Sequence, residues 1–171
     1  MDVGPEIEIM TDDPFELPFG DEFDPDSPAA AMARLRDRFH SIHSQASVII
    51  TGYAALELEV DQILRRFVAR PEKLPRLSMD HQLGLLRAML NDPWLDSALN
   101  AIGAFGAVRN SVAHGDPTEV IDRGILNLGK KSREIGLPLE SYPNLGVLAM
   151  HLASSLHVGT EFYECIIRDR Q

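Results

Sequence analysis

The sequence predicts an all-α protein, an up-and-down bundle of four to five helices preceded by a disordered acidic N-terminal tail. Three observations predict this fold class. Apolar residues recur at spacings of three and four over long stretches, which is the pattern of helices that bury one face in a bundle. No stretch alternates apolar and polar residues for long, so strands are not expected. Proline and capping residues separate the helical stretches from one another.

The tail is predicted to cover residues 1–27, and the helical domain residues 28–171. Ten of the 26 acidic residues and none of the 16 lysines and arginines precede residue 29, which leaves a neutral body. A segment this acidic and rich in proline cannot bury enough apolar surface to offset its chain entropy, so we expect it to be disordered. It is a solubilising tail, a mimic of nucleic acid, or a docking segment. In the last case the apolar residues at 10–19 would bind an antitoxin or a regulatory protein.

Composition places the chain among soluble, cytoplasmic proteins. Its 171 residues suffice for one sizeable core, and 44% apolar and 25% charged residues are ordinary for a globular protein. The single cysteine, Cys165, excludes an intramolecular disulfide and a cysteine-based zinc site. The acidic start and the absence of a long apolar run argue against membrane contact. No glycine-rich phosphate loop or two-histidine zinc helix is present, so neither a cofactor nor a metal is expected.

The first helix is expected to begin at Ser27 and Pro28, an N-cap followed by a proline at the first helical position. The pattern permits one helix as far as Ala69, since Pro71 ends it, although residues 44–47 or Gly52 could host a kink. Its apolar residues form one unbroken seam: Met32, Leu35, Phe39, Ile42, Ala46, Ile49, Tyr53, Leu56, Val60, Ile63 and Phe67.

Four further helices are expected. The second is capped by Ser78 and runs to about residue 90, and the third has Asp92 as its N-cap and ends before Gly115. Residues 118–134 form a weaker helix that contains two glycines. The last helix runs from about 144 to 168, and its inward residues are expected to be Leu145, Leu148, Leu152, Leu156, Phe162 and Ile166.

The third of these helices carries an arginine within its apolar stripe, which comprises Leu95, Ala98, Leu99, Ile102, Phe105, Gly106 and Ala113. Arg109 lies about 20° from the centre of that stripe. Because an unpaired guanidinium in a core costs several kcal/mol, Arg109 must meet a carboxylate or face a cleft or a second subunit. Glu57 and Glu59 flank the seam of the first helix on opposite sides. Either could orient Arg109, and either could equally be a surface carboxylate.

Arg109, Asn110 and His114 converge at the end of this helix, because residues four apart are neighbours on one side of it. Their pattern, R-N-x-x-x-H followed by glycine, resembles the signature of the HEPN domains (higher eukaryote and prokaryote nucleotide-binding). The resemblance covers roughly residues 28–170 and implies a HEPN-like helical bundle. It also implies that Arg109, Asn110 and His114 are the catalytic residues of a ribonuclease.

The three side chains suit metal-independent cleavage of RNA. Arginine binds a phosphate bidentately, histidine transfers a proton near neutral pH, and asparagine can bond the 2′-hydroxyl or a phosphate oxygen. The 2′-hydroxyl attacks the adjacent phosphate, so the chemistry selects RNA over DNA. Cleavage needs an acid and a base, yet the motif supplies one histidine. A two-fold homodimer would supply the pair, and the resemblance implies this arrangement and a toxin–antitoxin or antiviral defence role.

One residue departs from the toxin pattern. Some toxin members of the family carry a tyrosine two residues after the histidine, which a partner enzyme modifies, and this chain has Asp116 there. Other relatives of similar fold, of the mannitol-operon repressor type, are regulatory. The alternative function is therefore a non-catalytic, transcriptional-repressor-like helical regulator or a nucleotide-binding dimer.

Overall fold

The computed structural model describes residues 30–34 and 42–168. The chain divides into two units between His40 and Ser41, and the packing described below belongs to the second unit. Residues 30–34 of the first unit are helical. The predicted acidic tail, the helix start at Ser27 and Pro28, and Leu35 and Phe39 of the seam lie outside the described residues.

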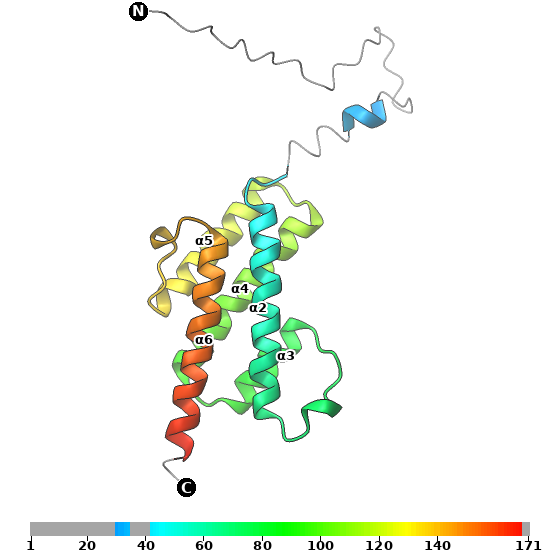
Figure 1. Ribbon diagram of the computed structural model, residues 1–171. Helices are drawn as coiled ribbons and strands as arrows, with labels where there is room; N and C mark the ends of the chain where they lie inside the picture. Colours follow the sequence, from blue (N-terminus) through cyan, green and yellow to red (C-terminus); the bar gives the residue numbers. More distant parts are fainter. Residues whose placement is uncertain (1–29, 35–41, 169–171) are drawn as a thin grey trace, which may run out of the picture. The chain divides into compact units, whose positions relative to one another are not determined.

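The second unit is built from five long helices and two short 3₁₀ helices (Figure 1). No strand occurs in the described ranges, so the predicted all-α bundle is confirmed. None of these helices has both the length and the hydrophobicity that crossing a bilayer requires. In chain order the elements are α2 (Ala46–Phe67), η1 (Pro71–Lys73), α3 (Met79–Met89), α4 (Pro93–His114), α5 (Thr118–Glu134), η2 (Leu139–Ser141) and α6 (Leu145–Arg168).

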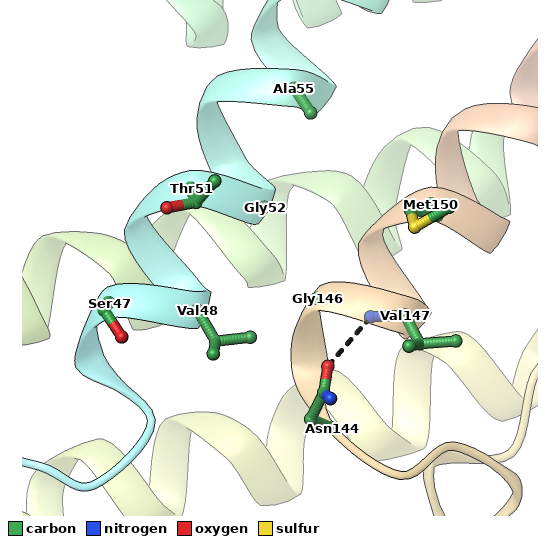
Figure 2. Close-up of a pocket in the computed structure, with 9 residues that line it drawn as sticks. All are labelled: Ser47, Val48, Thr51, Gly52, Ala55, Asn144, Gly146, Val147 and Met150. Carbon is green, nitrogen blue, oxygen red and sulfur yellow. Dashed lines mark hydrogen bonds between the residues drawn. The ribbon is translucent and has the colours of Figure 1, made fainter.

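The helix ends follow the capping residues. The Asp92 carboxylate accepts a hydrogen bond from the Leu95 amide at 2.9 Å at the start of α4, and Gly115 ends this helix in the left-handed region with φ of 69°. Asn144 caps α6 by accepting from the amide of Val147 at 3.1 Å (Figure 2). The predicted bounds of α4, α5 and α6 are thereby confirmed.

The permitted single helix to residue 69 is wrong, and the break overlaps residues 44–47, one of the two places expected to host a kink. Residues 42–45 form a bend and a turn, and α2 begins only at Ala46. Two members of the predicted seam are exposed, Met32 by 43% and Ile42 by 57%. Both lie before α2, one in the other unit and one in the turn. From Ala46 onward the seam is confirmed, and its buried members are Ala46, Ile49, Leu56, Val60 and Ile63.

Helix α4 is the centre of the bundle, since it packs against α2, α3, α5 and α6. Its apolar stripe is buried as predicted except for Ala113, which is exposed in the last turn. On α6 the inward face is also as predicted except for Phe162, which is exposed. Phe162 follows the buried Leu156 by six residues, which is about 240° around a helix. The inward face continues instead through the buried Thr160.

Helices α2 and α6 lie side by side and run in the same direction (Figure 1). Two contacts between them join residues 98 positions apart: Glu59 with His157 at 2.7 Å, and Arg66 with Glu164 at 3.1 Å. A constant offset is what parallel helices produce. The bundle therefore does not alternate strictly in direction. The connection 68–78 joins α2 to α3, and the connection 135–144 joins α5 to α6, and each pair of helices points the same way.

Candidate functional site

Arg109 lines a polar pocket of about 360 Å³ where α2, the start of α3 and α4 meet. Of the three environments expected for this arginine (a partner carboxylate, a cleft or a second subunit), the structure shows a cleft. Asn110 lines the same pocket, and four of its other lining residues are polar. The complete lining is Tyr53, Glu57, Ser78, Met79, Asp80, Gly103, Gly106, Ala107, Arg109 and Asn110.

The Arg109 side chain is half-buried, and only some of its hydrogen-bond donors have an acceptor. Its Nη1 donates a hydrogen bond to Asn110 Oδ1 at 3.1 Å, and its guanidinium carbon lies 5.4 Å from the centre of the Tyr53 ring. The Nε atom is buried and has no hydrogen-bond partner among the described residues. A buried donor without an acceptor is costly, and because protein atoms cover this Nε, the atom does not open into the pocket.

Tyr53 reaches the arginine because Gly106 has no side chain. A Cβ atom at position 106 would lie 3.1 Å from the Tyr53 ring and 3.4 Å from its hydroxyl oxygen. Burial raises the pKa of the Tyr53 hydroxyl, and the negative charges of Glu57 and Asp80 add to this while Arg109 opposes it. Since the ordinary pKa is already near 10, the phenol stays neutral at physiological pH and serves as a flat support for the guanidinium.

The N-terminus of α3 forms one wall of the pocket. Ser78 precedes this helix, as predicted, but its side chain makes no cap. The hydroxyl lies 2.7 Å from Nδ1 of His81 instead. The amides of the first turn therefore have no side-chain acceptor, and the helix dipole places partial positive charge there. Both features favour an anion beside Arg109.

The two candidate supporting carboxylates lie on different faces of α2. Glu57 lines the pocket, although it makes no ion pair or hydrogen bond among the described residues. Glu59 contacts Nδ1 of His157 on α6 at 2.7 Å, so its proposed support of Arg109 is wrong. Two positions along a helix correspond to about 200° of rotation, and only one of these side chains can face α4.

His114, the third member of the motif, does not line this pocket. It is the last residue of α4 and is exposed, one helical turn beyond Asn110. The structure thus brings Arg109 and Asn110 together in one cavity and leaves His114 accessible at the nearby helix end. A histidine at this position is also favoured by the dipole of the helix.

A second pocket, of about 470 Å³, lies between the beginnings of α2 and α6 and is lined mainly by apolar atoms (Figure 2). Val48 and Ala55 on one helix and Val147 and Met150 on the other carry most of its apolar side chains. No charged side chain lines it. It offers neither a general acid nor a base, and the polar pocket at Arg109 is the better candidate for chemistry.

Sequence reasoning missed three pocket residues. Tyr53 was assigned to the apolar seam, Ser78 to a cap, and Asp80 to no role. Tyr53 precedes Glu57 by four residues, and this spacing on one helix face could have indicated a polar site. Among the described residues no group of three His, Cys, Asp or Glu side chains is placed to hold a metal ion.

Comparison of the chain with family models, with curated proteins and with solved structures finds no match.

Proposed function

We propose that this protein is a metal-independent endoribonuclease of HEPN type, in which Arg109 holds the scissile phosphate. The observation that carries the proposal is the half-buried Arg109 guanidinium, which lines a polar pocket and whose one hydrogen bond among the described residues goes to Asn110. A phosphate would accept from the remaining guanidinium donors, and the uncapped amides in the first turn of α3 offer further donors.

Asn110 and His114 complete the chemistry. Because Asn110 Oδ1 already accepts from Arg109, its amide nitrogen is left to donate to a phosphate oxygen or the 2′-hydroxyl. His114 takes the proton of that hydroxyl and, once protonated, delivers a proton to the leaving 5′-oxygen. The products are a cyclic phosphate and a free 5′-hydroxyl, and no metal takes part.

A second copy of the chain supplies the missing proton carrier in this proposal. His114 does not line its own pocket, and it is exposed at the end of α4, one turn beyond Asn110. In the proposed dimer the ends of two α4 helices meet across a two-fold axis. The partner's His114 then reaches the Arg109 pocket. RNA is the substrate, and a role as a toxin or phage-defence effector is part of the proposal.

The alternative is a non-catalytic, HEPN-like regulator or nucleotide-binding dimer. The observation that favours it is the separation of His114 from the pocket, which leaves an anion site without a proton carrier in one chain. Binding of RNA or nucleotide without cleavage would support this alternative.

The test is an RNA cleavage assay in the presence of a chelator, with purified wild type and three alanine variants. We expect His114→Ala to lower the rate by at least roughly a hundredfold, since proton transfer typically contributes that much. Arg109→Ala should weaken both RNA binding and turnover, and Asn110→Ala should have an intermediate effect. Because His114 is exposed, its variant should melt like wild type. Undiminished cleavage by His114→Ala would contradict the proposal.

A further inference from the structure

The Arg109 pocket holds charges of both signs that do not neutralise each other. Glu57 is half-buried and Asp80 is exposed, and both line the pocket with Arg109. No ion pair joins either carboxylate to the guanidinium among the described residues. A bare phosphate would be drawn to Arg109 and repelled by the carboxylates. The ligand that fits this pocket therefore carries an anionic group and, beside it, a group with hydrogen-bond donors.

A nucleotide carries both an anionic group and hydrogen-bond donors, and its base determines how many hydrogen bonds it can donate to a carboxylate. A carboxylate has two acceptor oxygens and no donor. On its Watson–Crick edge guanine offers two adjacent donors, N1–H and N2–H₂, which match those oxygens. Adenine and cytosine each set a ring-nitrogen acceptor beside their amino group, and uracil flanks one N–H with two carbonyl oxygens. A lone pair facing a carboxylate is repulsive, so guanine alone gains two bonds.

We infer that this pocket selects guanine in RNA, with the Glu57 carboxylate accepting from N1–H and N2–H₂ while Arg109 holds the adjacent phosphate. The inference rests on the proposed ribonuclease function and adds the base preference of the same site. Glu57 is the reader rather than Asp80, because it is the less exposed of the two and its hydrogen bonds compete less with water. The pocket volume of about 360 Å³ lies within the range usual for small-ligand sites and suits one nucleotide.

The position of Tyr53 supports this assignment. Tyr53 precedes Glu57 by one helical turn, and the raised pKa of its hydroxyl reflects the nearby Glu57 charge after burial itself. The neutral phenol and the Glu57 carboxylate thus both line the pocket from α2. A base bound to the Glu57 oxygens lies beside the Tyr53 side chain.

The first test measures binding, with the His114→Ala variant of the full chain so that no cleavage interferes. The probes are the 3′-monophosphates of guanosine, inosine and adenosine, titrated by calorimetry. Inosine lacks only the 2-amino group of guanosine. We expect guanosine monophosphate to bind roughly ten- to a hundredfold more tightly than adenosine monophosphate, with inosine monophosphate between them. Equal affinity for all three would overturn the inference even if the enzyme cleaves RNA.

The second test substitutes Glu57, the residue proposed to recognise the base. Glu57→Gln replaces one acceptor by a donor, and an amide pairs with the N6–H and N1 edge of adenine. The preference of this variant should move from guanine toward adenine, in both the titration and the mapping of cleavage positions on a mixed-sequence RNA. Glu59→Gln is the matched control, since Glu59 lies two residues away and faces α6. An unchanged preference in Glu57→Gln, with a melting curve like wild type, would overturn the inference. If wild type binds guanosine monophosphate selectively but cleaves no RNA, only the proposed ribonuclease activity fails.

Discussion

Arg109 owes its environment to residues from three helices. The Tyr53 ring comes from α2, the uncapped turn beginning at Met79 from α3, and Asn110 from α4 itself. Each supplies something different: a flat support, partial positive charge and a hydrogen-bond acceptor. The periodicity of α4 alone places Arg109 in an apolar stripe, and this left three environments open: a carboxylate partner, a cleft or a second subunit. It could not indicate which side chains form that cleft, because the contacts depend on how separate helices pack.

Gly106 is the residue that allows Tyr53 to approach Arg109, so we predict that Gly106→Ala will impair the site more than the fold. The added Cβ would lie 3.1 Å from the Tyr53 ring and must push it aside. Displacement of a positioning group by a fraction of an ångström to 1 Å can lower the cleavage rate by up to roughly a hundredfold. The free energy of unfolding should stay within about 1 kcal/mol of wild type, because alanine favours a helix over glycine.

The control for this change is Gly84→Ala on α3, where a Cβ would meet nothing within 4 Å. It should raise stability by about 0.5–1 kcal/mol and leave cleavage unchanged. Cleavage by Gly106→Ala at the wild-type rate would show that Tyr53 does not position the arginine.

Helices α2 and α6 approach each other so closely that small residues are required where they touch. A Cβ at Gly52 would lie 3.0 Å from the Cβ of Ala149 and 3.5 Å from the Cα of Gly146. These are backbone and first-atom contacts, which cannot move without separating the helices. We predict that Gly52→Ala lowers the free energy of unfolding by about 1–3 kcal/mol, the usual cost of overpacking.

Urea unfolding of a double-mutant cycle measures this contact. Ala149→Gly should cost less in the Gly52→Ala background than in wild type, because it removes the atom that clashes. Strict additivity of the two changes would contradict close packing at this point.

The helices differ in how well their bounds could be predicted from the sequence. The bounds of α4, α5 and α6 followed from Asp92, Pro93, Gly115 and the prolines of the connections, because capping is local chemistry. The first helix was extended too far because its apolar seam continues in sequence through residues 42–45, where the chain turns. Apolar spacing alone does not distinguish a continuous helix from two helices whose patterns happen to be in phase. The prediction that Phe162 faces inward was wrong for a related reason, since a step of six residues from Leu156 leaves the inward face of the helix.

For the whole molecule, the formal charge of −10 is misleading as a guide to the site. The acids in excess lie before residue 29, whereas the described bundle places Arg109 and the start of α3 together at one cavity. Long-range repulsion of RNA by the net charge is screened within about 10 Å at ordinary salt concentration. Whether a phosphate binds there depends on its position in the pocket, beside Arg109 and away from the Glu57 and Asp80 carboxylates. Within one chain this pocket lacks His114, so the proposed cleavage requires a second copy.

Mixing two inactive variants addresses that dependence. If the Arg109 pocket of one chain is completed by the partner's His114, a dimer of an Arg109→Ala chain and a His114→Ala chain contains one intact site and one site lacking both residues. We predict that each variant alone is nearly inactive and that mixing them, under conditions where subunits exchange, restores metal-independent RNA cleavage. A contaminating nuclease could not produce this recovery from two inactive preparations. If subunits exchange and the mixture stays as inactive as its components, the site shared between two copies is contradicted.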